Sequence, residues 1–198
     1  MRRLLLATGN PGKLREFRRL LVGVPFEVVS PADIGLTLEV DEDGPSYAQN
    51  AAKKAEAFAA AGRCVALADD SGIEVDALDG RPGLHSARFG GPGLDDHDRL
   101  KLLLRELEGV PVDRRGARYR AVVAIACPGR GTRLFDATWE GRVGFASRGE
   151  RGFGYDPVFE LSDGRTSAEM TDVEKDAVSH RGQAVRAAAA YFRDGGAG

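Results

Sequence analysis

The chain has 198 residues, of which 42% are hydrophobic and 29% charged, and its formal net charge is −2. This length and composition predict one globular domain that buries a core, and the charge argues against a general nucleic-acid binder, which would be basic. The apolar start of the chain breaks at Gly9, too early for a signal peptide or a membrane span, and the two cysteines lack metal-site spacing. We therefore expect a cytoplasmic protein with buried free thiols and no zinc site.

A glycine turn between the first strand and the first helix is the earliest feature that suggests chemistry. Residues 3–8 predict a buried strand, and the apolar spacing from Leu14 to Leu21 predicts a helix, with the turn 9–13 between them. Backbone N–H groups at such a junction point toward an anion. Lys13 opposes the helix dipole there, which a bound phosphate would offset. The alternative is an ordinary strand-to-helix turn.

An acidic segment and a capped helix come next. A second strand is predicted over 26–29, and the acidic segment 39–43 is either solvated or brings a carboxylate to a metal site. Ser46 and Gln49 form a capping-box pattern that starts a helix ending at Gly62. One face of this helix carries a polar pair at i, i+4: Asn50 and Lys54.

Two adjacent acids follow the central apolar run of the chain. Residues 64–68 predict a buried strand, and the stretch Asp69-Asp70-Ser71-Gly72 comes directly after it. Asp, Ser and Gly are typical of turns. Two carboxylates side by side at the end of a buried strand repel each other, and a divalent cation or a proton relieves that repulsion. Both interpretations, a turn and a cation site, stay open here.

The middle of the chain predicts a loop, a helix and a hairpin. Residues 79–93 are rich in Gly and Pro, which is typical of a functional or mobile loop, and they carry His85 and Arg88. The other predicted elements are a helix capped by Asp95 over 96–108, strands over 117–127 and 132–140, and short strands over 73–75 and 143–146. The two long strands are joined too closely for a crossover, so they predict an antiparallel hairpin and a mixed sheet.

Aromatic and cationic groups gather toward the C-terminus. Residues 152–159 combine glycines with aromatics, so Phe153 is either an exposed ring that stacks on a base or a core residue. A second capping box begins at Thr171, and the final helix is predicted to start near Ser179. Cations around that start oppose the helix dipole unless an anion binds: Lys175, His180 and Arg181.

Paired acids and misplaced cations together indicate a metal-dependent enzyme that acts on a nucleotide. Lys13, Lys175 and Arg181 lie where anions are expected. Mg²⁺ binds one or two carboxylates together with phosphates and waters, which suits Asp69 and Asp70. Phosphoanhydride chemistry needs charge neutralisation and positioning more than a covalent nucleophile, and the sequence has no convincing Ser/His/Asp or Cys/His set.

In their order these motifs resemble the inosine/xanthosine triphosphate pyrophosphatases, also called HAM1-like or non-canonical purine NTP pyrophosphatases. The matching stretches are 7–13 (ATGNPGK), 50–55 (NAAKKA), 68–72 (ADDSG), 82–88 (PGLHSAR), 152–157 (GFGYDP) and 179–184 (SHRGQA). The resemblance implies Mg²⁺-dependent hydrolysis of ITP, dITP and XTP to the monophosphate and pyrophosphate by a homodimer. It implies an α/β fold: a single two-lobed domain over 1–198, with a long mixed central β-sheet flanked by helices and an active-site cleft between the lobes.

The resemblance also implies roles for individual residues. Asp70 would bind the metal and accept a proton from the attacking water, with Glu42 as a second ligand and Asp69 supporting both. The residues that would hold the triphosphate are Thr8, Gly9, Asn10 and Lys13. Phe153 would stack on the base, and the other substrate-binding residues would be Ser71, Gly154, Tyr155, Asp156, Lys175, His180 and Arg181. Neither a nucleic acid nor a membrane is an expected partner.

Gln49 is a departure from the family pattern, in which many members have Glu before the helix asparagine. If that carboxylate helps the metal site, Gln49 weakens the site by one charge. Two other functions stay open: a catalytically weak nucleotide-binding regulatory module, and a structural α/β protein whose turns and caps serve packing alone.

Overall fold

The computed structural model describes residues 2–196, which divide into two compact units. Unit 1 contains the chain up to Asp70, the segment Ala121–Ala137 and the chain from His180 onward. Unit 2 contains Ser71–Arg120 and Thr138–Ser179. Each unit has its own cluster of buried apolar side chains. Over the described residues, no helix combines the length and the apolar character that crossing a bilayer requires.

The strands form one six-stranded sheet in the order β2-β1-β3-β4-β5-β6. Their bounds are β1 (Arg3–Leu6), β2 (Glu27–Val29), β3 (Val65–Val75), β4 (Gly116–Ala126), β5 (Arg133–Val143) and β6 (Phe159–Glu160). β1 pairs in parallel with β2 and with β3, whereas β5 pairs antiparallel with β6. The sheet is therefore mixed, as predicted. The neighbours β4 and β5 are joined by the short connection 127–132, as expected of a hairpin.

Side-chain caps explain where several helices begin. The α-helices are α1 (Pro11–Leu20), α2 (Tyr47–Gly62), α3 (Asp96–Glu106), α4 (Asp172–Val178) and α5 (His180–Arg193). Ser46, Asp95 and Thr171 each accept a hydrogen bond from a backbone N–H three residues later, which confirms three predicted starts. The Ser46 box differs in one detail, because the Gln49 side chain accepts from the Ser46 hydroxyl.

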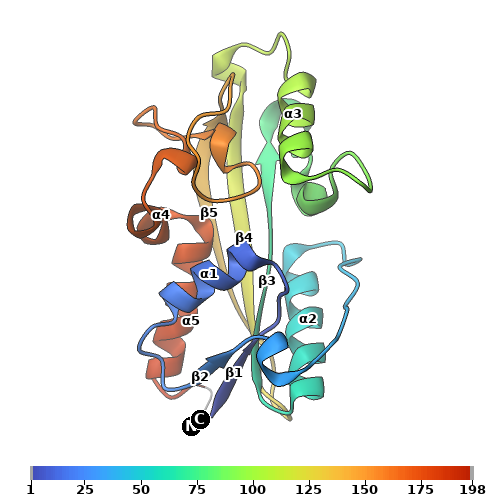
Figure 1. Cartoon of the computed structure of the whole chain (residues 1–198), viewed down its shortest axis with the longest axis vertical. Helices are drawn as coiled ribbons and strands as arrows, with labels where there is room; N and C mark the ends of the chain where they lie inside the picture. The colour runs from blue at the N-terminus through green and yellow to red at the C-terminus, as the bar shows by residue number, and fades with distance from the viewer. Residues whose placement is uncertain (1, 197–198) are drawn as a thin grey trace. The chain divides into compact units, whose positions relative to one another are not determined.

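In unit 1, the alternation of side chains along the strands divides the core between two faces. Leu4, Val65 and Leu67 pack with apolar residues of α1 and α5. Leu5 points the opposite way, and a Cβ placed on Gly62 at the end of α2 would lie 2.8 Å from Leu5 Cδ2. Figure 1 shows α1 beside α5, with α2 on the other side of these strands. One face therefore belongs to α1 and α5, and the other to α2.

The core of unit 2 is built around aromatic rings. The ring centroid of Phe159 lies 4.6 Å from that of Tyr119 and 5.1 Å from that of Trp139. Beside this core Arg115 is buried, with 2% of its surface exposed. Its guanidinium donates at 2.7–2.8 Å to three backbone carbonyls, those of Leu107, Val143 and Gly144. Arg115 thereby ties the end of α3 to the end of β5.

The structure corrects four predictions. β3 is one continuous strand, so the chain does not turn after the paired acids, and the predicted strand 73–75 is its continuation. No separate strand forms over 143–146, because β5 ends at Val143. Cys64 and Cys127 are free, but they are half-buried because they lie just outside β3 and β4. Lys175 lies in the short helix α4 and not at the start of the final helix.

Candidate functional site

β3 presents its two adjacent acids on opposite faces of the sheet. Asp69 has the parity of Val65 and Leu67, so its side chain points toward α1 and α5. Asp70 has the parity of Ala66 and points toward α2. The exposed fractions of the two acids are 0% and 5%. One strand thus supplies a buried carboxylate to each of two environments.

Asp69 lies between two buried cations. Lys13 Nζ, on α1, is 2.9 Å from Asp69 Oδ1, and Arg181 Nε, on α5, donates to Oδ2 at 3.1 Å. Burial alone would raise the pKa of Asp69, but these cations outweigh it and hold that pKa well below its usual range. Burial lowers the pKa of Lys13 despite the attraction to Asp69, and repulsion from Arg181 and Lys54 adds to that effect. Asp69 is therefore a charged anchor that fixes the positions of two cations.

Glu16 is a further member of this cluster that sequence reasoning missed. Arg181 donates through its terminal nitrogen to Glu16 Oε2 at 2.6 Å. Burial would lower the pKa of Arg181, but Asp69 and Glu16 raise it further than burial lowers it. The available signal is an acid one helical turn after Lys13 and beside the core residue Phe17, a position that becomes buried in α1.

On the α2 side of β3, an amide holds Asp70. Asn50 Nδ2 donates to Asp70 Oδ2 at 2.9 Å, and Asn50 Oδ1 accepts from the backbone N–H of Gly44 at 2.8 Å. Burial raises the pKa of Asp70 more than the Asn50 hydrogen bond lowers it, and the charge of Glu42 raises it further. A buried carboxylate with a raised pKa is well suited to accept a proton near neutral pH.

The acids beside Asp70 suit a cation that prefers oxygen ligands. Glu42 is close enough to act on the pKa of Asp70, and it forms an ion pair with Lys54 of α2. Among residues 2–196, no group of three or more His, Cys, Asp or Glu side chains is arranged to hold a metal ion. A pair of carboxylates fits Mg²⁺ better than it fits a metal held by protein ligands alone, because Mg²⁺ takes other ligands from waters and phosphates.

The predicted phosphate-binding turn is held by its own side chains. Thr8 Oγ1 accepts from the N–H of Asn10 at 3.1 Å, and Asn10 Oδ1 accepts from the N–H of Lys13 at 3.0 Å. Asn10 is therefore the N-cap of α1, and Pro11 follows at the first helical position. A Cβ added to Gly9 would meet no atom within 4 Å, so this side of the turn is open. An open helix N-terminus is a ready anion site.

In unit 2, Asp156 is the centre of a second group of predicted residues. Its buried carboxylate accepts from Lys175 Nζ at 2.6 Å, from Ser167 Oγ at 3.0 Å and from the Phe153 N–H at 2.9 Å. A Cβ on Gly152 would lie 2.0 Å from Asp156 Oδ2. Lys175 Nζ also lies 5.2 Å from the centroid of the Phe153 ring. Asp156 thus holds the backbone of the turn that carries Phe153.

Two further hydrogen bonds connect this turn to other segments of unit 2. The Tyr155 hydroxyl donates to the Ser86 carbonyl at 2.9 Å, and the Gly154 N–H donates to Asp96 Oδ2 at 3.1 Å. Burial raises the pKa of Tyr155. Tyr155 is a buried anchor, whereas Phe153 is half-buried.

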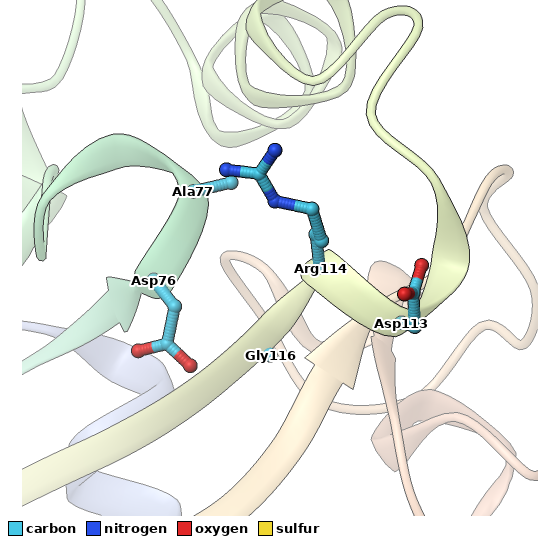
Figure 2. A pocket seen from close by; sticks show the side chains of 5 residues that line it. All are labelled: Asp76, Ala77, Asp113, Arg114 and Gly116. Carbon is cyan, nitrogen blue, oxygen red and sulfur yellow. The ribbon is translucent and has the colours of Figure 1, made fainter.

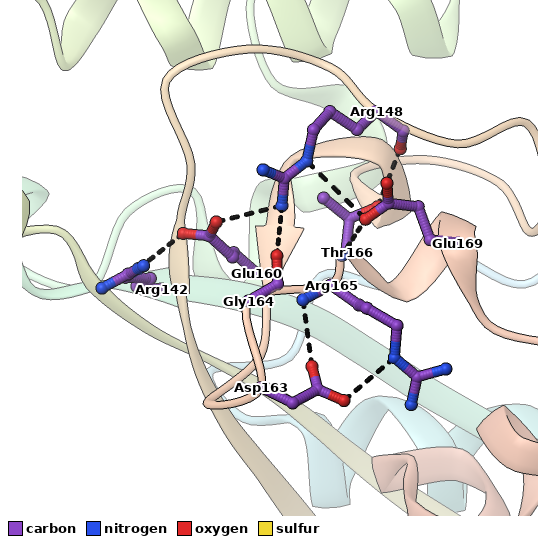
Figure 3. A network of polar contacts seen from close by, with 8 residues as sticks. All are labelled: Arg142, Arg148, Glu160, Asp163, Gly164, Arg165, Thr166 and Glu169. Atoms are coloured by element: carbon purple, nitrogen blue, oxygen red, sulfur yellow. Dashed lines mark hydrogen bonds and ion pairs between the residues drawn. The ribbon is translucent and has the colours of Figure 1, made fainter.

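An ion-pair network braces the segments on either side of this turn (Figure 3). Glu160 of β6 accepts from Arg142 at 2.6 Å and from Arg148 at 3.0 Å. The Thr166 hydroxyl donates to the carbonyl of Arg148 at 2.8 Å. Thr166 directly precedes Ser167, so the network reaches the Asp156 carboxylate through one residue.

A small polar pocket of unit 2 contains none of the predicted site residues. Its lining consists of Asp76, Ala77, Asp113, Arg114 and Gly116 (Figure 2). Asp76 is paired with Arg118 at 2.8 Å, and its Oδ2 lies 2.5 Å from where a Cβ on Gly116 would be. One of the two acids that line this pocket, Asp76, is therefore already paired with a cation.

The predicted residues fall into two groups, one in each unit. The residues in unit 1 are Thr8, Gly9, Asn10, Lys13, Glu42, Asp69, Asp70, His180 and Arg181. The residues in unit 2 are Ser71, Phe153, Gly154, Tyr155, Asp156 and Lys175. Sequence reasoning did not assign Asn50, Lys54 or Ser167 to either group, although it placed Asn50 and Lys54 on one face of their helix.

Comparison with known proteins finds close relatives along nearly the whole chain. The Ham1 family matches residues 4–191. A dITP/XTP pyrophosphatase of Symbiobacterium thermophilum is 50% identical over 187 residues, covering 93% of this chain and 91% of that protein. A dITP/XTP pyrophosphatase of Geobacillus kaustophilus is 46% identical over 186 residues, with the same coverage of 93% and 91%. A solved HAM1 protein from Coxiella burnetii, 33% identical, matches with a TM-score of 0.88 over 98% of this chain and 100% of that chain.

Proposed function

The chain belongs to the Ham1 family, and from this membership we propose that it hydrolyses ITP, dITP and XTP to the nucleoside monophosphate and pyrophosphate. It is an enzyme, a nucleoside triphosphate pyrophosphatase that acts on non-canonical purine nucleotides. The buried acids Asp69 and Asp70 support this activity over the regulatory and structural alternatives, because strongly perturbed carboxylates are typical of sites that perform chemistry.

The observation that carries this proposal is the placement of Asp69 and Asp70 on opposite faces of β3. Asp69 fixes Lys13 and Arg181, which supply positive charge for a triphosphate. Asp70 points to the other face of β3, where burial raises its pKa although Lys13 and Lys54 act to lower it. One acid therefore orders the cations while the other is kept for proton transfer.

In the proposed reaction, water attacks the α-phosphorus and the bond from that phosphorus to the bridging oxygen of the β-phosphate breaks. Asp70 accepts the proton of the attacking water. Lys13, Arg181 and the open α1 N-terminus neutralise negative charge on the transferred and leaving groups, which is the main requirement of phosphoryl chemistry.

We propose Mg²⁺ as the cofactor, with Asp70 and Glu42 as its protein ligands. When bound, the ion would neutralise phosphate charge and polarise the phosphoryl group. Asp69 supports the site without ligating the metal, because its two oxygens lie against Lys13 and Arg181.

We propose that Phe153 stacks on the purine base and that Gly154, Tyr155 and Asp156 shape the turn that presents it. Donor side chains among Lys175, His180 and Arg181 would face the 6-oxo group of hypoxanthine or xanthine. Adenine carries an amino donor at that position, so it would leave the donors unpaired and be rejected by up to several powers of ten.

For the assembly, we propose a cytoplasmic homodimer of single-domain chains that uses neither nucleic acid nor a membrane. The net charge of −2 supports the absence of a nucleic-acid partner. Light scattering of the purified protein measures the oligomeric state directly, and a monomer at micromolar concentration would contradict the dimer.

A pyrophosphate-release assay with ITP, XTP, ATP and GTP, with and without Mg²⁺, tests the function. We expect Mg²⁺-dependent release of pyrophosphate from ITP and XTP and little from ATP. Release of orthophosphate would contradict the proposal and indicate a phosphatase. Binding of ITP without hydrolysis would favour the regulatory module.

A further inference from the structure

Asn50 connects two parts of unit 1 that are far apart in sequence. It lies in the first turn of α2, and only 1% of its surface is exposed. Its amide nitrogen donates to Asp70 of β3, and its amide oxygen accepts from the backbone of Gly44 in the segment that precedes the helix. A buried amide that makes hydrogen bonds in two directions holds both partners at fixed distances.

The chemistry of the partners fixes the orientation of this amide. A backbone N–H only donates, so the atom of Asn50 that faces Gly44 must be the oxygen. The nitrogen must then face Asp70, whose carboxylate oxygen accepts. Rotating the amide by 180° would put a donor against a donor and an oxygen against an oxygen. The Asn50 side chain therefore has one stable state.

The segment held at Gly44 carries Glu42 two residues earlier. A Cβ on Gly44 would lie 2.7 Å from Asn50 Oδ1 and 3.2 Å from the Gln49 Cβ, so glycine permits the backbone to approach the amide closely. Glu42 in turn acts electrostatically on Asp70. The two acids thus share one side chain that sets the position of both.

We propose that Asn50 is a positioning residue for the pyrophosphatase reaction, holding Asp70 through one amide atom and the Glu42 segment through the other. This inference rests on the proposed function. It assigns to an uncharged helix residue the geometry on which proton transfer at Asp70 depends, and misplacing a reacting group by about 1 Å costs roughly 10²-fold in rate.

The decisive variant is Asn50→Asp, which keeps the volume and the acceptor for Gly44 but removes the donor to Asp70. We expect kcat for XTP hydrolysis to fall roughly 10²-fold while KM changes by less than about threefold, because substrate contacts are untouched. Ser46→Ala is the matched control. It removes the N-cap of the same helix without touching Asp70, so it lowers the melting temperature and leaves kcat unchanged.

Gly44→Ala tests the second contact without removing a polar group. Its Cβ would clash with Asn50 Oδ1, so we expect kcat to fall with little change in KM. If Asn50→Asp does not fold, as circular dichroism would show, Gly44→Ala decides the question.

The inference is overturned if folded Asn50→Asp keeps the wild-type kcat, or if kcat falls no further than in Ser46→Ala at an equal loss of melting temperature. In either case wild-type pyrophosphate release would leave the proposed function intact. Absence of pyrophosphate release from the wild-type protein would overturn the proposed function, and this inference with it.

Discussion

At the scale of single residues, the proposed chemistry of unit 1 depends on charged side chains that are buried as ion pairs. Arg181 binds Asp69 and Glu16 at 3.1 and 2.6 Å, and Asp69 also binds Lys13. A buried ion pair adds little net stability compared with apolar packing, but losing one partner leaves an uncompensated charge in a poor solvent. The cluster therefore holds the cations in place, but removing any one of its members should destabilise the folded protein strongly.

Glu16→Gln should lower the free energy of unfolding by about 3 kcal/mol, because Arg181 keeps its charge and loses one of its buried carboxylates. Urea denaturation followed by circular dichroism measures this loss. Glu27→Gln is the control, since the Arg3–Glu27 pair is 3.6 Å long and more than half exposed. It should cost less than about 0.5 kcal/mol. Equal losses in the two variants would contradict the buried-pair argument.

Asp70→Asn should reduce pyrophosphate release from XTP by about 10²- to 10⁴-fold, because the amide cannot accept the proton of the attacking water. In the wild type, the rate should rise with pH as Asp70 loses its proton, since the base acts only when deprotonated. A pH–rate profile of both proteins measures this. An undiminished rate in the variant would exclude Asp70 as the base.

Single residues could be predicted where they conflict with local rules, and not where they obey them. Lys13 stands out in sequence because it opposes the helix dipole, and the structure places it against Asp69. Glu16 and Asn50 break no local rule, because acids and amides are ordinary on helix surfaces. Their importance comes from burial against β3 and α5, which only tertiary packing decides.

At the scale of elements, helix starts were predictable and the course of β3 was not. A cap is a contact between residues three apart, so Ser46, Asp95 and Thr171 reveal it in sequence. The Asp-Asp-Ser-Gly stretch favours a turn locally, but β3 has hydrogen-bonded neighbours on both sides, β1 and β4. The pairing with β1 ends at Leu67, so beyond that residue the pairing with β4 outweighs the turn preference and keeps the strand extended through the acids.

Gly152→Ala should disrupt the Phe153 turn, because φ is +77° and the new Cβ would lie 2.0 Å from Asp156 Oδ2. We expect a loss of stability together with a raised KM for XTP. Gly164→Ala is the matched control: its φ is +83°, but no atom lies within 4 Å of the added Cβ. It should cost only the left-handed strain, about 1 kcal/mol. Thermal unfolding and steady-state kinetics distinguish the two, and equal effects would contradict the role of Asp156.

The cap of α4 should make stability depend on pH in the acid range. The backbone N–H and hydroxyl of Thr171, with Arg165, lower the pKa of Glu174 from 4.5 to about 2. Because the folded pKa is depressed, the stabilisation is complete above the unfolded pKa and is lost as pH falls toward 2. The stability difference between wild type and Glu174→Gln should therefore shrink between about pH 5 and pH 2. Urea unfolding across this range measures it, with Glu150→Gln as an exposed-acid control; a constant difference would contradict the cap.

At the scale of the whole molecule, binding of a ligand should raise the free energy of unfolding. A substrate that binds only the folded protein stabilises it by about 2.7 kcal/mol at a concentration of 100 Kd. The Asp70→Asn protein is expected to hydrolyse XTP slowly enough for binding to be measured, so its melting temperature should rise with XTP concentration. ATP serves as the control nucleotide and should raise it less. An unchanged melting temperature with XTP would favour the structural alternative.

The α/β class, the mixed sheet and the element order were predictable, because periodicity and connection length are properties of the chain itself. The apolar pattern did not show which residues belong to which of the two cores, since Val65 and Ile73 belong to one strand yet pack in different clusters. Apolar pattern reports that a residue is buried, but it does not report which other residues bury it. The predicted cleft between lobes stays a prediction.

The alternation of side chains along β3 also constrains how this gene can change. Inserting or deleting one codon anywhere in 65–68 would exchange the faces of Asp69 and Asp70, sending the proposed base in among the cations and the anchor to Asn50. Loss of two codons would restore the faces but displace both acids by about 6.6 Å along the strand. A substitution at these positions does not change which face of the sheet Asp69 and Asp70 occupy. The segment should therefore accept changes of residue far more readily than changes of length.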